Sequence, residues 1–305
     1  LRLNESSEIS IGGGALTITV GTPATVAFYQ HRGDRAHTVF KEGGKLKTRG
    51  FLGQRGVKSM VGTYSFGGGE LEVADVFYLA GAGLQEDVSC TFNQSGGTVS
   101  LTNTALNVTG PFPLTSSPRA VGIYNFSGGT INALCEVDDP ERVGVRKGIG
   151  KGTFNWTGGV LNAKRMSESI TNSGGRMSPG GEQTVGETLL IGKAPAVYLQ
   201  QSKGVLSIDI AGRSRYDKLV WKNTSGNATV KLESGTVISI NCLKDYKPTS
   251  GQTFQIISAD RIEASRLLLE GKESRNFSYQ IIESGPKTGL ALVYTPGKGG
   301  GKLAE

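Results

Sequence analysis

The chain has 305 residues, 37% of them hydrophobic, so it can bury a sizeable core as one elongated domain or two compact ones. No stretch approaches the roughly 18 consecutive apolar residues that a membrane-spanning helix requires, so we expect no transmembrane segment. The 46 glycines favour an all-β protein with many turns, and the formal net charge of +7 favours polyanionic neighbours.

A Gly-Gly motif recurs roughly every 30 residues along the first two thirds of the chain. The clearest copies are TYSFGGGELEV (63–73), TFNQSGGTVSL (91–101), IYNFSGGTINA (123–133) and TFNWTGGVLNA (153–163). Weaker copies occupy 8–18, 39–48 and 198–208, and a short apolar run ending in Gly precedes several of them. Each repeat therefore predicts three short strands, which is the amount of chain in one coil of a parallel β-helix.

Each motif also predicts where its side chains lie within a coil. We expect an aromatic residue from each copy to stack inside the solenoid, namely Tyr64, Phe92, Tyr124 and Phe154. The residues two positions further on are expected to face outward, namely Phe66, Gln94, Phe126 and Trp156. The glycines are expected at corners that need positive φ, namely Gly68, Gly69, Gly96, Gly97, Gly128, Gly129, Gly158 and Gly159.

The pattern changes after the last weak copy. We predict a parallel β-helix repeat domain over 1–204, a C-terminal β module that closes the stack over 205–296, and a flexible or docking tail over 297–305. Within the C-terminal module, longer alternating strands are separated by Gly turns, and a short helical piece fits Ala259 to Glu270.

The motifs GTFNWTGGVLNA and GIYNFSGGTINA resemble the autotransporter-associated β-strand repeats of large bacterial surface proteins. The segment from Ile208 to Ile240 resembles the segment that often closes such arrays. This resemblance implies an exported parallel β-helix that is exposed on, or released from, a bacterial cell. The expected fold is therefore all-β: a right-handed parallel β-helix with a C-terminal β cap.

Three asparagines share one position of the repeat, and each begins an Asn-x-Ser/Thr triplet: Asn93, Asn125 and Asn155. An asparagine ladder, or turn-forming asparagines beside the Gly corner, would explain this column. Glycan attachment is the alternative.

The densest acidic cluster runs from Glu136 to Arg142. Polysaccharide lyases and glycosidases need carboxylates, and lyases also need a basic group, which Asp138, Asp139, Glu141 and Arg142 could supply. Asp138 and Asp139 could also bind Ca²⁺ weakly, whereas a solvated turn would fit the adjacent like charges and the proline equally well. No cofactor is expected from any motif.

Basic residues cluster earlier in the chain, and the stripe of interest consists of Lys41, Lys45, Lys47, Arg49 and Arg55. It could contact acidic polysaccharide, the cell envelope or a neighbouring subunit, or it could be a solvated face. Arg32-Gly33-Asp34, flanked by His31 and His37, reads as a solvated loop or as a cell-attachment tripeptide. No motif supports specific nucleic-acid recognition.

The three cysteines, Cys90, Cys135 and Cys242, allow at most one disulfide and show no metal-ligand spacing. The sequence as a whole favours an extracellular structural protein, a stalk or a fibre subunit that self-associates head-to-tail or by strand addition. The alternatives are an adhesin or acidic-glycan-binding module, and a polysaccharide lyase or glycosidase built on a β-helix.

Overall fold

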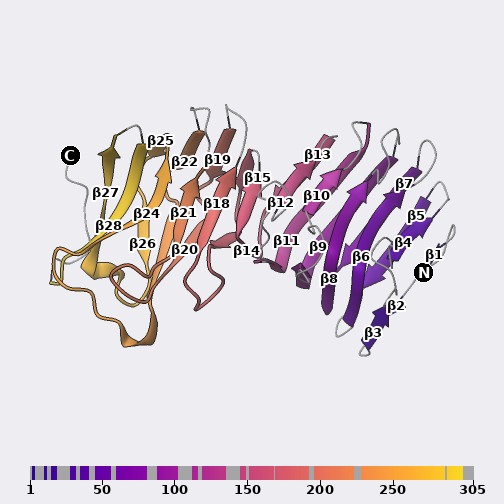
Figure 1. The fold of residues 1–305 in the computed structure, drawn as a ribbon, viewed down its shortest axis with the longest axis horizontal. Coiled ribbons are helices and arrows are strands. Elements are labelled where there is room, and N and C mark those ends of the chain that lie inside the picture. The colour runs from indigo at the N-terminus through magenta and orange to yellow at the C-terminus, as the bar shows by residue number, and fades with distance from the viewer. Residues whose placement is uncertain are drawn as a thin grey trace. The chain divides into compact units, whose positions relative to one another are not determined.

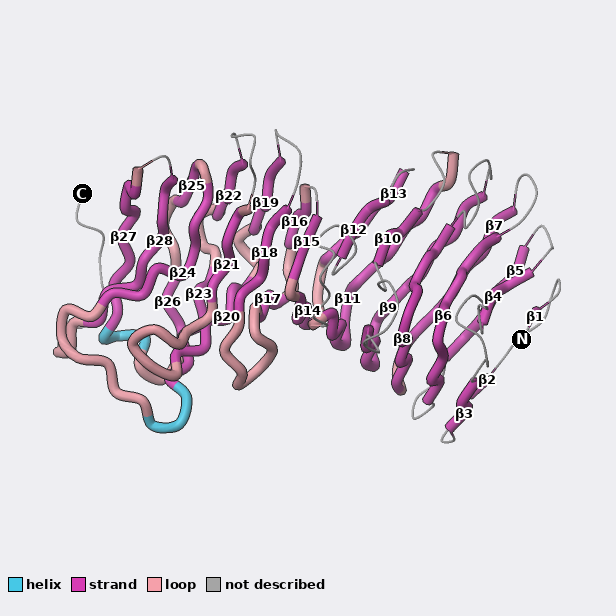
Figure 2. The backbone as a smooth tube through the Cα atoms, in the orientation of Figure 1, coloured by secondary structure: helices cyan, strands magenta, loops and turns pink. Residues whose placement is uncertain are grey.

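The computed structural model is all-β, with parallel strands stacked as a β-solenoid of about five turns and a period of ~31 residues (Figures 1 and 2). The predicted parallel β-helix is therefore confirmed. Two compact units divide the chain, Leu1–Val160 and Leu161–Glu305, and each is described by itself. The structure describes residues 2–3, 10–11, 15–18, 28–31, 35–40, 45–55, 60–80, 88–101, 112–115, 119–134, 145–148, 151–167, 169–191, 196–222, 228–285 and 287–297.

The first unit contains β1 (Arg2–Leu3), β2 (Ser10–Ile11), β3 (Ala15–Ile18), β4 (Phe28–His31), β5 (Arg35–Phe40), β6 (Lys45–Arg55), β7 (Met60–Phe66), β8 (Glu70–Ala80), β9 (Val88–Leu101), β10 (Phe112–Thr115), β11 (Val121–Ala133), β12 (Val145–Gly148) and β13 (Lys151–Trp156). Among the described residues of this unit, strand pairings are parallel and join strands of successive coils. Long strands bend at a corner and serve two columns: β9 pairs with β7 through residues 88–94 and with β8 through residues 98–101.

A stack of aromatic rings fills the centre of the first unit. Ring centroids of Tyr64 and Phe92 lie 6.0 Å apart, those of Phe92 and Tyr124 lie 4.9 Å apart, and those of Tyr124 and Phe154 lie 5.6 Å apart. The first three side chains are fully buried and Phe154 is 6% exposed. Because the coils stack in register, each ring meets the ring of the equivalent repeat position in the next coil.

A second buried column lies beside these rings, and here the expectation from the sequence was wrong. Phe66, Gln94, Phe126 and Trp156 do not face outward: each is at most 1% exposed. Side chains alternate between the two faces of a strand, so residues two apart share a face and Trp156 points inward with Phe154. The Trp156 ring stacks on the Phe126 ring with centroids 6.4 Å apart.

The two glycines of each corner have different roles. A β-carbon at Gly128 would lie 2.3 Å from the Ser95 carbonyl oxygen, so this position needs glycine because the backbone of the preceding coil passes so close. Gly129 has a φ of 80°, in the left-handed region that side chains disfavour. Positive φ recurs at the second glycine of the other corners, Gly69, Gly97 and Gly159. The first glycines Gly96 and Gly158 are equally close to backbone oxygens.

The second unit contains most of β14 (Val160–Ala163), then β15 (Arg165–Ser167), β16 (Ile170–Asn172), β17 (Arg176–Ser178), β18 (Glu187–Ile191), β19 (Ala196–Gln200), β20 (Val205–Ile210), β21 (Lys218–Trp221), β22 (Ala228–Leu232), β23 (Val237–Cys242), β24 (Thr253–Ala259), β25 (Arg261–Ala264), β26 (Leu268–Glu270), β27 (Phe277–Ser284) and β28 (Lys287–Tyr294), with 3₁₀ turns η1 (Leu243–Asp245) and η2 (Ser274–Asn276). Three parallel columns continue here, β15–β18–β21–β24, β16–β19–β22–β25 and β17–β20–β23–β26.

The strand direction reverses at the C-terminal end. β28 pairs antiparallel with β24, and β27 pairs antiparallel with β28 (Figure 1). The rings of Phe254 on β24, Phe277 on β27 and Tyr294 on β28 pack in sequence, with centroids 6.2 and 5.1 Å apart. The helical piece expected over Ala259 to Glu270 was wrong: this segment forms β25 and β26, which add to the solenoid columns. The boundaries expected at residues 204 and 296 stay predictions.

Removing a ring from the central stack should destabilise the fold. We expect Phe92→Ala to lower the free energy of unfolding by about 3–5 kcal/mol, because a buried aromatic side chain is lost and a cavity remains. Urea unfolding followed by circular dichroism measures the change. Thr91→Ala on the same strand, at a half-buried position, is the matched control and should cost far less. Equal losses in the two variants would contradict a dominant role for the ring stack.

Candidate functional site

The repeated asparagines form a ladder of side-chain hydrogen bonds on β9, β11 and β13. The Asn125 Nδ2 donates to Asn93 Oδ1 at 2.8 Å, and the Asn155 Nδ2 donates to Asn125 Oδ1 at 2.7 Å. The three residues are register partners in successive coils, with Asn93 and Asn125 half-buried and Asn155 exposed. An amide suits this arrangement because it carries both a donor and an acceptor, so identical side chains can bond in sequence.

A glutamine interrupts the inner aromatic column of the first unit. Gln94 is fully buried, and its Nε2 donates to the carbonyl oxygens of Gly97 at 3.4 Å and Thr130 at 3.2 Å. Its Oε1 accepts the hydroxyl hydrogen of Tyr124 at 2.5 Å. Burial raises the pKa of the Tyr124 hydroxyl well above its ordinary value, so this phenol stays neutral and donates. Gln94 thus joins the corner to the ring stack.

The second unit uses amides at comparable corners. Asn172 is fully buried; its Oδ1 accepts the backbone N–H of Gly175 at 2.7 Å, and its Nδ2 donates to the Gly175 carbonyl at 2.9 Å. Its register partner Gln200 accepts the hydroxyl hydrogen of Tyr198 at 2.8 Å. The Asn172 contacts satisfy backbone groups of Gly175 at the corner, and the Gln200 contact joins two side chains.

A pair of buried carboxyl groups lies at the end of β20. Asp209 is 3% exposed and Asp217 is fully buried. The two oxygens of Asp217 accept the backbone N–H groups of Gly186 at 2.7 Å and Asp209 at 2.9 Å. Asp209 Oδ1 accepts the Asn241 Nδ2 at 3.0 Å. Polar contacts therefore link three successive parts of the stack through these acids.

Burial is the main cause of the raised pKa values of Asp209 and Asp217. Desolvation raises the pKa of Asp217 to about 7, with a further rise from the negative charge of Asp209. Desolvation also raises the pKa of Asp209; the Asn241 amide and the backbone groups of Gln183 and Thr184 lower it, but only in part. Neither carboxylate has an ion-pair partner among the residues that the structure describes.

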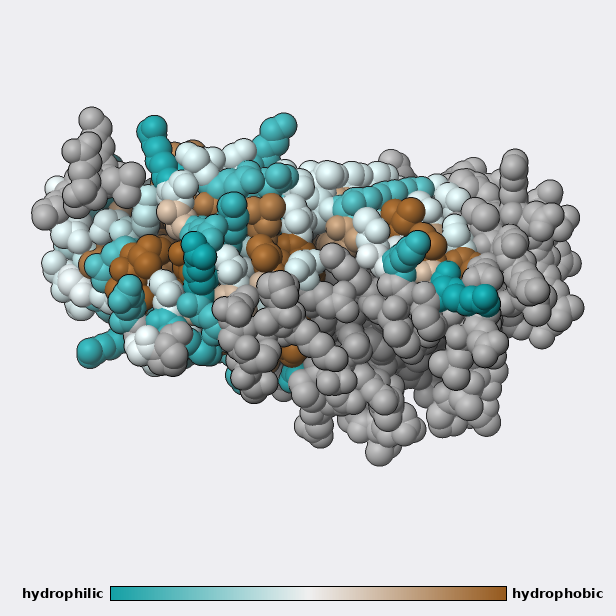
Figure 3. Space-filling model, turned by 90° about the horizontal axis from the view of Figure 1, so that it is seen from above, coloured by the Kyte–Doolittle hydropathy of each residue, from teal (hydrophilic) through white to brown (hydrophobic). Residues whose placement is uncertain are grey.

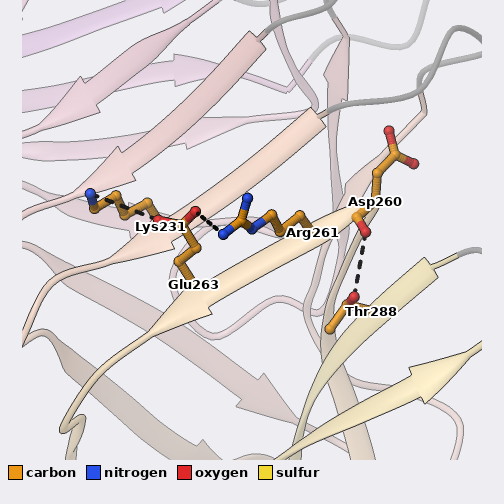
Figure 4. A network of polar contacts seen from close by, with 5 residues as sticks. All are labelled: Lys231, Asp260, Arg261, Glu263 and Thr288. Carbon is orange, nitrogen blue, oxygen red and sulfur yellow. Dashed lines mark hydrogen bonds and ion pairs between the residues drawn. The ribbon is translucent and has the colours of Figure 1, made fainter.

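A charged network of a different kind lies on the surface of β22 and β25. Glu263 lies 3.1 Å from the Arg261 guanidinium and 3.8 Å from the Lys231 ammonium (Figure 4). Thr288 of β28 donates to the Asp260 carbonyl at 3.4 Å and so ties the terminal hairpin to this edge. The ion pairs are largely solvated, so each contributes little to stability.

A cavity of about 260 Å³ lies at the C-terminal end of the second unit, lined by residues that include Cys242, Tyr246, Lys247, Lys272 and Glu273. Burial and the negative charge of Glu273 raise the pKa of the Cys242 thiol, so this thiol is held in its protonated form and is a weak nucleophile. Cys90 is buried, its thiol pKa is also raised, and neither cysteine is in a disulfide. Cys135 lies outside the described residues.

Most candidates singled out in the sequence cannot be placed in a site. Asp138, Asp139, Glu141, Arg142, Lys41 and Arg32-Gly33-Asp34 lie outside the described residues. Lys45, Lys47, Arg49 and Arg55 lie on β6, His31 on β4 and His37 on β5, where the structure describes the backbone alone. In the described part of the chain, no three His, Cys, Asp or Glu side chains gather as a metal site would require. The catalytic, Ca²⁺ and basic-stripe assignments stay predictions.

Sequence reasoning missed the buried polar residues. Gln94 could have been noticed, because the aligned positions hold Phe66, Phe126 and Trp156. Asp209 carried no such signal, since an Asp between two Ile residues at 208 and 210 fits an ordinary alternating strand with its polar side chain in water.

Breaking the asparagine ladder should cost stability without disturbing the core. We expect Asn125→Ala to lower the free energy of unfolding by about 1–2 kcal/mol, because it removes the shared member of two side-chain hydrogen bonds. Asn155→Ala removes one bond and should cost less, which makes it the internal comparison. Urea unfolding of both variants measures the difference, and no loss in Asn125→Ala would contradict a stabilising ladder.

No helix in the described residues has the length and apolar character needed to cross a membrane. Models of known protein families give no match to this chain, and no curated protein matches it either.

Proposed function

We propose that this chain is an extracellular structural protein of a bacterial cell surface, a stalk or self-associating fibre subunit whose role is mechanical. The observation that carries the proposal is the repetition of self-complementary contacts from coil to coil. Rings meet rings, and amides meet amides, along a continuous parallel backbone ladder. The bacterial surface location rests on the resemblance of the repeats to autotransporter-associated β-strand repeats.

Such a stack suits a load-bearing role for a physical reason. Each coil buries its apolar side chains mainly against the coils next to it, so the elements resist bending and separation together. Buried amides at the corners, such as Gln94 and Asn172, fix the path of the backbone where the strands turn. The buried apolar side chains and the corner amides therefore serve contacts between coils.

The terminal hairpin supports self-association. β27 pairs with β28 on one side, and its other edge has no strand partner among the described residues. An open edge carries unpaired N–H and C=O groups that accept a further strand. Ile281 on this strand is 44% exposed, and Leu268 of β26 is 42% exposed. On the face seen in Figure 3, hydrophobic residues form small patches separated by hydrophilic ones, so the backbone edge is the better candidate for contact.

Purified protein should form filaments whose length grows with concentration. Negative-stain microscopy and sedimentation across a range of concentrations measure this. Discrete particles at every concentration would overturn the fibre proposal.

A charge on the terminal edge should weaken assembly. We expect Ile281→Lys to raise the concentration needed for filaments by about tenfold or more, because an added cation must be desolvated where a strand would pair. Thr171→Lys is the matched control: this exposed residue lies on β16, within the stack, and should leave assembly unchanged. Filaments formed equally well by Ile281→Lys would remove β27 as the contact.

A further inference from the structure

Asp209 and Asp217 lie at the two ends of one short turn. The Ala211 N–H donates to the Arg215 carbonyl at 2.8 Å and closes the turn, while the Asp217 N–H donates to the Asp209 carbonyl at 2.9 Å. The return bond runs from the Asp209 N–H to Asp217 Oδ2. These bonds hold the two residues together, with the Asp217 carboxyl group against the Asp209 backbone.

A neighbouring segment buries the side chain of Asp209. On β20, alternation places Leu206, Ile208 and Ile210 inward, so Asp209 lies on the outer side of the strand. It is nevertheless 3% exposed, with the backbone of Gln183 and Thr184 beside it. These residues belong to the loop from Ser178 to Gly186, which we call the cover loop. The cover loop turns back on itself, since the Thr184 N–H donates to the Gly181 carbonyl at 3.1 Å.

The carboxyl oxygens of Asp209 and Asp217 do not all accept hydrogen bonds. Both oxygens of Asp217 accept backbone N–H groups, one of them from Gly186 at the end of the cover loop. Asp209 Oδ1 accepts from Asn241, whereas the buried Oδ2 makes no hydrogen bond. The backbone groups of Gln183 and Thr184 lower the pKa of Asp209, but Oδ2 completes no hydrogen bond with them. A negative charge on this buried oxygen is therefore only weakly offset.

Among the residues that the structure describes, no cation forms an ion pair with either acid. The cover loop contributes Glu182, whose charge raises the pKa of Asp209. β23 contributes the neutral Asn241, and the turn contributes the exposed Arg213 and Arg215, which make no ion pair with either acid. The Lys218 ammonium lies 4.9 Å from the centre of the Tyr216 ring. Two buried carboxylates without a cation are strongly disfavoured, so the closed structure retains one proton.

We propose that Asp209 and Asp217 form a proton-dependent lock: one proton held by the pair keeps the cover loop closed over β20, and loss of that proton favours opening of the loop. With one proton on the pair, a carboxyl oxygen of Asp217 still accepts the Gly186 N–H, and the pair carries at most one negative charge under the loop. When the pair loses this proton, the second charge requires water, which reaches it once the cover loop moves away.

The sign of the pH effect follows from the raised pKa values. A carboxyl group whose pKa is higher in the folded protein stabilises the fold below its ordinary value near 3.8, and this contribution is lost as the pH rises through the folded value of about 7. The two groups titrate as a pair, so the opening reports the pair and not one residue. Protection of the cover loop should therefore decrease between about pH 4 and pH 7 and level off above it.

Hydrogen exchange of the unchanged full chain tests the lock. After correction for the intrinsic pH dependence of exchange, we expect protection of the amides at 182–186 to fall by up to about tenfold for each pH unit between about pH 4 and pH 7, and to level off above it. Amides of β23 serve as the internal reference for global unfolding. Asp209→Asn keeps the shape and the bond from Asn241 but prevents the second negative charge, so protection of its cover loop should depend less on pH.

Two further measurements keep the result decisive. Glu182→Gln removes a negative charge near Asp209, lowers the pKa of the pair and should move the midpoint to lower pH. If Asp209→Asn fails to fold, ¹³C NMR of the Asp carboxyl carbons in the unchanged protein should show one of them titrating near pH 7. Loop protection that is independent of pH, an identical pH profile in Asp209→Asn, or carboxyl carbons that all titrate below pH 5 would each overturn the lock.

Discussion

The parallel, in-register stacking of coils is the constraint from which the rest of this structure follows. It places each repeat position directly against the same position in the next coil, so side chains must be compatible with copies of themselves. Aromatic rings meet this condition by stacking, as from Phe92 to Tyr124 to Phe154. Amides meet it by donating from one side and accepting on the other, as in the ladder from Asn93 to Asn155.

Charged side chains fail the same condition, since like charges would face each other in successive coils. The register partners of the described charges show how the chain avoids this. Lys231 lies opposite Glu263, and Asp209 lies opposite the neutral Asn241. Asp217 is held by backbone N–H groups instead of a side chain in the next coil. The acids at the end of β20 are thus accommodated by amides and backbone groups, which satisfy hydrogen bonds but do not cancel charge.

The sequence predicted the parts of the fold that repeat, because repetition exposes a periodic physical requirement. The inner rings and the Gly pairs of the corners could be located from aligned copies alone. The side of the strand taken by Trp156 was also predictable, and the error came from separating two residues that alternation keeps on one face. The strands β25 and β26 were harder, since the segment from Ala259 to Glu270 becomes extended only by pairing with β22 and β23.

Features that depend on contacts between different coils, or on non-repeating chain, were harder to predict. Gln94 differs from the aromatic residues aligned with it, but its burial depends on the carbonyls of Gly97 and Thr130 and the hydroxyl of Tyr124, which converge on it and which no local pattern predicts. Asp209 is buried by a cover loop that leaves the stack well before it in sequence. The side chains of such a loop need not be compatible with copies of themselves, because the loop has no copy in the next coil. An irregular segment is therefore where a solenoid can place an unpaired acid, and it is also the part of the chain that can move without breaking the ladder.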